Sequence, residues 1–269
     1  MELNQKNKAN TILICSDLHC RNFYKPILNV KDTPIIFMGD YMDPYWYEGT
    51  TDERGIENFK EIIDFAKNNT NVTLLVGNHC ASWIWSPMNF ERTSYEHYDE
   101  LHKLYRDNIE LFHACKKIGN VLFTHAGVSD GWVNSVNNSF YWNENGEELE
   151  NPSFIITEDN IDSYINSEFE KELKHEKARH HLWDSYLDSP IFDIGYARGG
   201  NAPYGGPFWD DFNEEYWDPK GWNLIQIFSH TQREVTGSIG INGNGYCIDS
   251  RAIFEYDVES ETISKANLL

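Results

Sequence analysis

Five short segments of this chain carry side chains that can bind metal ions, and each segment follows an apolar run. A lone Asp or His at the end of a strand is more often a turn residue or a hydrogen-bonded polar group than a ligand. The segments are Asp17-Leu18-His19, Gly39-Asp40-Tyr41-Met42-Asp43, Gly77-Asn78-His79, His125-Ala126-Gly127 and Ser229-His230-Thr231. Five such segments in one chain favour a different interpretation, a hydrolase that uses two metal ions.

The donor atoms in these segments form a mixed set of oxygen and nitrogen ligands. Asp17 and His19 lie two residues apart, so in an extended chain both point to one side and can hold one ion. Asp40 can offer its carboxylate to two ions at once. This set suits Mn, Fe, Zn or Co better than Ca, and two such ions can activate a shared water for displacement at a phosphoryl group. An amide oxygen and two imidazoles complete the set, from Asn78, His125 and His230.

Buried strands are predicted where the apolar runs precede the ligand segments. The runs cover residues 11–16, 34–38, 71–76, 121–124 and 224–229 and are rich in Ile, Val, Leu and Phe. Further strands are predicted at 235–241, 246–249 and 252–256, with a hairpin turn at Gly243-Asn244-Gly245.

Two helices are predicted between these strands. One follows a Thr50-x-x-Glu53 capping box, and a Thr93-x-x-Glu96 box opens a second helix whose apolar positions extend to Cys115. Strands that alternate with helices predict an α/β fold with at least some parallel pairing. Functional groups in such sheets gather beyond the carboxyl ends of the strands, where each ligand segment falls.

The chain of 269 residues is long enough for one α/β domain with an insertion. We expect a single domain over residues 1–269, with an irregular insertion at about 129–222 over the active edge of the sheet. One clear helical stretch is predicted inside this insertion, at about 160–183.

The charge and cysteine content limit the classes of partner. The 22 Lys and Arg against 43 Asp and Glu give a formal net charge of −21, which opposes attachment to nucleic acid or anionic membrane. A phosphate site in this field needs bound cations and a nearby Arg. The five Cys without CxxC spacing favour reduced thiols, and neither a signal peptide nor a membrane-spanning apolar run is visible. We therefore expect a soluble, cytoplasmic protein.

The five segments together resemble those of the calcineurin-like metallophosphoesterase superfamily, and they span most of the chain. The isolated HAG and the single His of SHT are most similar to the phosphoprotein phosphatases and diadenosine tetraphosphatases. The resemblance implies a four-layer α/β/β/α sandwich of mixed sheets that binds two divalent ions, with Mn as the first candidate. It also implies one ion held by Asp17, His19 and Asp40, and a second held by Asp40, Asn78, His125 and His230.

The same resemblance implies that His79 is the general acid that protonates the leaving alkoxide, with Asp43 orienting it. A carboxylate partner favours the charged imidazolium, which agrees with that role. The segment Leu182-Trp183-Asp184 and the later Arg198-Gly199 pair are similar to stretches of the phosphatases. Arg198 is therefore a candidate phosphate clamp that uses the fork of the guanidinium.

Three residues beside the ligand segments depart from the family pattern. Pro44 stands where phosphoprotein phosphatases place an Arg, which removes one phosphate contact and puts Ser/Thr phosphatase activity in doubt. Cys80 follows GNH where an acidic residue is usual, and Cys20 replaces a common Gly. Arg21 or Arg54 could compensate for the missing Arg.

These features predict an enzyme that hydrolyses phosphate monoesters of proteins or small molecules, with activated water as nucleophile and a phosphoprotein phosphatase-like ligand set. Two alternatives stay open at this point. Aromatic residues near the ligand segments could stack a nucleobase, which is typical of a dinucleoside polyphosphate or nucleotide hydrolase. The other alternative is a binding module that keeps the fold without catalysis.

Overall fold

The computed structural model describes residues 10–85, 92, 95–138, 141–142, 148–149, 155–175, 187, 189–213 and 222–268. They form two compact units, and the two larger sheets are both mixed. The first unit comprises Met1–His113, Gln232–Gly240 and Ile248–Leu269, and the second comprises Ala114–Thr231 and Ile241–Cys247. The predicted α/β class with mixed sheets is confirmed, while the single domain with an insertion at 129–222 stays a prediction.

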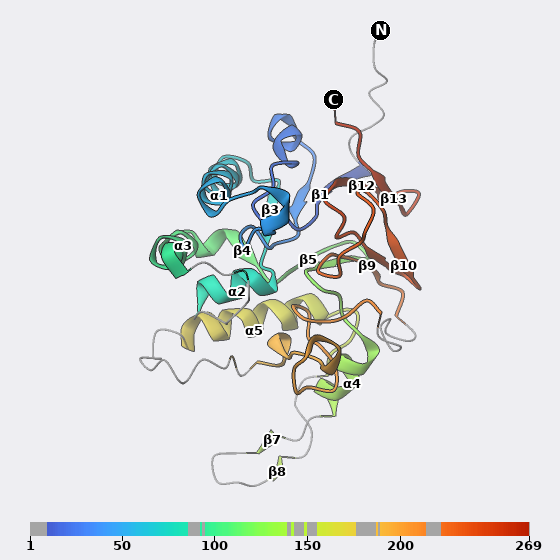
Figure 1. Ribbon diagram of the computed structural model, residues 1–269. Helices are drawn as coiled ribbons and strands as arrows, with labels where there is room; N and C mark the ends of the chain where they lie inside the picture. The colour runs from blue at the N-terminus through green and yellow to red at the C-terminus, as the bar shows by residue number, and fades with distance from the viewer. Residues whose placement is uncertain are drawn as a thin grey trace. The chain divides into compact units, whose positions relative to one another are not determined.

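The first unit contains a six-stranded sheet in the order β13-β12-β1-β2-β3-β4 (Figure 1). Its strands are β1 (Thr11–Cys15), β2 (Ile35–Phe37), β3 (Val72–Leu75), β4 (Phe112–His113), β12 (Ile253–Asp257) and β13 (Thr262–Lys265). Strands β1 to β4 pair in parallel, whereas β12 pairs antiparallel with both β1 and β13. The carboxyl ends of β1, β2 and β3 therefore lie at one edge, and the first three ligand segments follow them.

The second unit contains a five-stranded sheet in the order β10-β11-β9-β6-β5. Its strands are β5 (Cys115–Ile118), β6 (Val121–Thr124), β9 (Ile225–Phe228), β10 (Gly240–Asn242) and β11 (Gly245–Cys247). Strands β6 and β9 pair in parallel, so the last two ligand segments leave adjacent strands at the same edge. The predicted turn between β10 and β11 is confirmed, with Gly243 at φ 52°.

Five α-helices are described, together with a small β7–β8 pair in the second unit (Tyr141–Trp142 and Glu148–Leu149). In the described part of the chain, no helix has both the length and the apolar character needed to cross a membrane. The helices are α1 (Asp52–Lys67), α2 (Asn78–Ile84), α3 (Tyr98–Arg106), α4 (Asp130–Asn137) and α5 (Ile161–His175).

An aromatic core supports the ligand loops of the first unit. Tyr41, inside the second ligand segment, stacks on Phe59 of α1 at a ring separation of 4.8 Å. Phe59 also contacts Tyr105 of α3, and Tyr105 contacts Phe112 of β4, at 4.6 and 5.2 Å. The Tyr41 hydroxyl donates to the main-chain oxygen of Leu75 at 3.0 Å. This core fixes the loop after β2 against the sheet and both helices.

The predicted boundaries of both helices near the site are partly wrong. Helix α1 is capped by Thr51 rather than Thr50, because the extended Thr51 places its hydroxyl to accept from the Arg54 N–H at 3.3 Å. Helix α3 ends at Arg106 instead of extending to Cys115. The Asn108 side chain donates to the Leu104 oxygen at 2.7 Å and closes the helix, and the strands β4 and β5 follow.

Two predictions in the later part of the chain are confirmed only in part. The strand predicted at 235–241 is limited to β10, because the chain turns at Gly237 with φ 81°. The helical stretch predicted at 160–183 is α5, which covers Ile161–His175. Residues 176–183 of that stretch lie outside the described residues.

Cys20, one of the departures from the family pattern, packs closely against α1. A Cβ atom built on Gly55 would lie 2.2 Å from the sulfur of Cys20. Cys20 itself has φ 65°, the left-handed region that glycine adopts without strain. Cys20 thus carries a side chain where the family commonly has Gly, and Gly55 of α1, which has no side chain, provides the space for it.

We expect Gly55→Ala to destabilise the protein by about 1–3 kcal/mol through overpacking, although Ala favours a helix by about 1 kcal/mol. The free energy of unfolding in urea measures the effect. In a Cys20→Gly background the same change should be neutral or stabilising, because the nearest neighbour left is Met42 Cε at 3.1 Å, the end of a flexible side chain. An equal loss in both backgrounds would show that the Cys20 contact does not set the cost.

Candidate metal centre

Three predicted ligands of the first unit, Asp17, His19 and Asp40, come together at the carboxyl edge of β1 and β2. Their ligand atoms all lie within 4.8 Å of one another, and each residue is at most 3% exposed. Nε2 of His19 lies 3.7 Å from Oδ2 of Asp40. Two carboxylates and an imidazole make a donor set that fits a divalent transition-metal ion.

The His19 ring is oriented for ligation by its other nitrogen. Nδ1 lies 3.1 Å from the main-chain oxygens of both Met42 and Asp43, so Nδ1 carries the proton and donates. Nε2 is then unprotonated, and its lone pair is available to a metal ion beside Asp40. Burial lowers the pKa of His19, although the Asp40 carboxylate opposes this shift, so the neutral imidazole that binds metals is favoured.

The ligand loops adopt strained backbone conformations. His19, Asp40 and Asp43 have φ values of 43°, 47° and 65°, which non-glycine residues rarely adopt. The loops after β2 and β3 also approach closely, since a Cβ atom on Gly39 would lie 2.6 Å from the Gly77 nitrogen. Strain of this kind gathers at functional sites, where it fixes side-chain directions.

His79 and Asp43 form a hydrogen-bonded pair beside this cluster. Nδ1 of His79 lies 2.5 Å from Oδ2 of Asp43, which is fully buried. The main-chain N–H of His79 donates to Oδ1 of Asp40 at 3.0 Å, so the pair is tied to the cluster. Asn78 begins α2 and is 2% exposed. The structure therefore places His79 and Asp43 together, as expected of an acid and its orienting carboxylate.

Cys80 contacts Asp40 in place of the acidic residue that is usual after GNH. The main-chain N–H of Asp40 donates to the Cys80 sulfur at 3.2 Å, and that sulfur lies 3.9 Å from Oδ1 of Asp40. Burial, followed by the Asp40 carboxylate, raises the pKa of Cys80 to about 12. A neutral thiol therefore orients Asp40 without adding negative charge.

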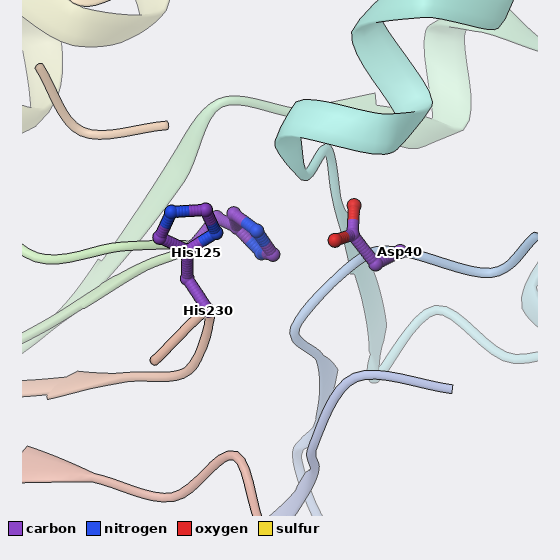
Figure 2. Close-up of side chains that lie close together, drawn as sticks. All are labelled: Asp40, His125 and His230. Atoms are coloured by element: carbon purple, nitrogen blue, oxygen red, sulfur yellow. The ribbon is translucent and has the colours of Figure 1, made fainter. Parts of the chain in front are cut away.

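The two predicted ligands of the second unit lie side by side. His125 follows β6 and His230 follows β9, and their ring centroids are 5.1 Å apart. The main-chain N–H of Ser229 donates to the His125 oxygen at 2.8 Å and holds the two loops together. Figure 2 shows the two imidazoles of this pair, and each could offer one ligand atom to a metal ion.

Arg198 lies in the same unit and is held by two partners. Its Nε lies 2.9 Å from Oδ2 of Asp211, and its Nη2 donates to the hydroxyl of Thr231 at 2.7 Å. Thr231 directly follows His230, so the guanidinium lies beside that ligand segment. Leu182-Trp183-Asp184 lies outside the described residues.

The two arginines that could compensate for the Arg absent at position 44 have different surroundings. Arg21 is 9% exposed, and its guanidinium donates to both carboxylate oxygens of Glu48, at 2.5 and 3.0 Å. Arg54 is exposed in the first turn of α1. Sequence reasoning missed Arg92, whose Nη2 lies 3.1 Å from Nε2 of His79. No motif marks Arg92, because it lies outside the five segments and only the fold brings it to His79.

Comparisons with known proteins agree with the fold. A mutant of a cold-active protein tyrosine phosphatase has a similar structure, with a TM-score of 0.56 and 14% identity over 96% of this chain and 80% of that chain. The cold-active protein-tyrosine phosphatase of a psychrophile, Shewanella sp., gives a TM-score of 0.55 and 15% identity over 96% of this chain and 80% of that chain. Such low identities show the fold alone.

No curated protein matches the chain. The family described as calcineurin-like phosphoesterase matches residues 10–233, which include all five ligand segments. The chain therefore belongs to the calcineurin-like phosphoesterase family, whose members are metal-dependent phosphoesterases.

Proposed function

We propose that this protein is a two-metal phosphatase that hydrolyses phosphate monoesters. One ion would be held by Asp17, His19 and Asp40, and the second by Asp40, Asn78, His125 and His230. The buried carboxylate and imidazole cluster of the first unit carries the proposal, because its neutral, oriented His19 fits a ligand. The paired imidazoles of the second unit support the second site.

Two ions held by these residues would supply an activated water and would offset charge on the phosphoryl oxygens. His79 gives its proton to the leaving oxygen as the ester bond breaks. Asp43 fixes the imidazole ring through Nδ1, which directs Nε2 away from that carboxylate. The main-chain N–H of His79 donates to Asp40, so the proposed acid and the proposed metal ligands keep a fixed position relative to one another.

Arg198 is proposed to bind the phosphate of the substrate. Asp211 and Thr231 fix the guanidinium beside the His230 segment, which reduces the entropy lost when it binds an anion. The forked donors of Arg suit two oxygens of one phosphate.

A phosphoprotein is the proposed substrate, and aryl phosphates are the first compounds to test. The similar structures are named as protein tyrosine phosphatases, and phosphotyrosine is an aryl phosphate. Pro44 removes an Arg that the Ser/Thr phosphatases use, so phosphotyrosine and phosphoserine peptides should be compared directly.

A nucleotide or dinucleoside polyphosphate is the second candidate substrate. Trp46 and Tyr47, just after the Asp43 loop, are 85% and 56% exposed. Such rings could stack a nucleobase. Trp83, by contrast, is buried in the first unit and cannot form part of a stacking surface.

Metal removal tests the proposed function. We expect the purified protein to hydrolyse an aryl phosphate with Mn, to lose activity in a chelator and to regain it when Mn is restored; Fe, Zn and Co are compared in parallel. A panel of phosphotyrosine and phosphoserine peptides, mononucleotides, dinucleoside polyphosphates and phosphodiesters then identifies the substrate. Metal-loaded protein that turns over no member of the panel would favour the non-catalytic binding module.

A further inference from the structure

Arg92 lies against the general acid and an aromatic ring of the first unit. Its Nη2 is 3.1 Å from Nε2 of His79, and its guanidinium carbon lies 3.6 Å from the centroid of the Tyr45 ring. The Tyr45 ring in turn lies 5.1 Å from the ring of His19. Arg92 thus contacts the proposed acid His79 directly, and only the Tyr45 ring separates it from the predicted metal ligand His19.

The guanidinium of Arg92 is positively charged, yet no carboxylate in the described part of the chain pairs with it. Its Nη1 is buried and has no hydrogen-bond partner among the described residues. Other arginines of this acidic protein are paired, Arg21 with Glu48 and Arg198 with Asp211. A buried donor without an acceptor is costly, so an anionic ligand at this position would remove that cost.

The imidazole of His79 is a weaker hydrogen-bond acceptor for Arg92 than a phosphate oxygen would be. Arg has only donors, so in the absence of substrate Nε2 of His79 accepts in this contact. A substrate phosphate that draws the guanidinium to itself would leave Nε2 free to carry the proton that the general acid donates. An anionic phosphate oxygen attracts the guanidinium more strongly than a neutral imidazole nitrogen does, because both partners then carry opposite charges. A phosphate bound at His79 would therefore attract the guanidinium, and the Tyr45 ring would hold its plane by a cation–π contact.

From these contacts we infer that Arg92 binds the phosphate of the substrate and replaces the contact that Pro44 cannot make. The inference rests on the proposed function. Arg21 has all three guanidinium nitrogens engaged, since Nε and Nη2 donate to Glu48 and Nη1 donates to the main-chain oxygen of Asp17, so it would have to give up a present partner. Arg92 needs no such exchange, because its present acceptor is an imidazole and its Nη1 is unsatisfied within the described residues.

Kinetics and phosphate binding in Arg92 variants test the inference. For Arg92→Gln we expect KM for an aryl phosphate to rise about 10- to 100-fold, with a smaller fall in kcat. The Kd of inorganic phosphate for the Mn-loaded protein, measured by calorimetry, should rise by a similar factor. Arg92→Lys keeps the positive charge but loses the forked donors, so its KM and its Kd for phosphate should fall between those of the wild type and those of Arg92→Gln. Arg106→Gln, which removes one positive charge at the end of α3, is the matched control.

Unchanged KM and unchanged phosphate affinity in Arg92→Gln would overturn the inference. A fall in Tm and kcat with unchanged phosphate affinity would also overturn it, because it would show a purely structural contact with Tyr45. Loss of phosphate binding in Arg54→Gln but not in Arg92→Gln would assign the role to Arg54. If the wild type binds phosphate through Arg92 yet turns over no ester, the proposed function fails while the phosphate site stands.

Discussion

Asp40→Asn is expected to lower kcat/KM for an aryl phosphate by about 1,000-fold or more, because the loss of metal stabilisation costs several kcal/mol. Asp40 lies in the cluster with Asp17 and His19, and it also accepts from the N–H of His79. Neutralising this one carboxylate would thus weaken metal binding at both proposed sites and weaken the hydrogen bond that holds His79. Steady-state kinetics and metal content by mass spectrometry measure the two effects.

The control for Asp40→Asn is Asp64→Asn, which makes the same change on the exposed face of α1. We expect Asp64→Asn to keep full activity and two ions per chain. The Asp40 variant should bind at most one ion, with little loss of folded structure by circular dichroism. Full activity with two bound ions in Asp40→Asn would refute the bridging role.

The ligand segments could be recognised from the sequence because each depends on local pattern. A short apolar run predicts a buried strand, and in an α/β sheet the residues after that strand lie at the functional edge. Asp17, His19 and Asp40 therefore come together as expected. The pairing of His79 with Asp43 is expected too, but from the family resemblance rather than from spacing.

The features that sequence reasoning missed depend on contacts between distant residues. Thr50 and Thr51 are equally good caps on paper, and only the backbone conformation selects Thr51. The closeness of Cys20 and Gly55 joins a loop to a helix 35 positions later, which no periodicity shows. Arg92 reaches His79 in the same long-range way. Its charge gave no signal, since any surface Arg looks the same in a sequence.

His79→Asn is expected to lower kcat for an alkyl phosphate by about 100- to 10,000-fold, the usual contribution of general acid catalysis. An alkoxide is a poor leaving group and needs a proton as the ester bond breaks. A nitrophenolate is stable as an anion, so nitrophenyl phosphate should lose far less. The ratio of the two effects separates loss of the acid from damage to the metal sites, which would slow both substrates equally.

Asp43→Asn should also lower kcat more for the alkyl phosphate than for nitrophenyl phosphate, but by a smaller factor than His79→Asn. The amide oxygen can still accept from Nδ1 of His79, but it does not stabilise the imidazolium as the buried carboxylate does. His97→Asn is the matched control, because that imidazole lies near Glu53 on α1, 3.8 Å from its carboxylate, and has no role in the proposed reaction. We expect His97→Asn to leave both substrates unchanged. Equal losses on alkyl and nitrophenyl phosphates in the His79 and Asp43 variants would assign this pair to organising the metal site, since only a proton donor distinguishes the two leaving groups.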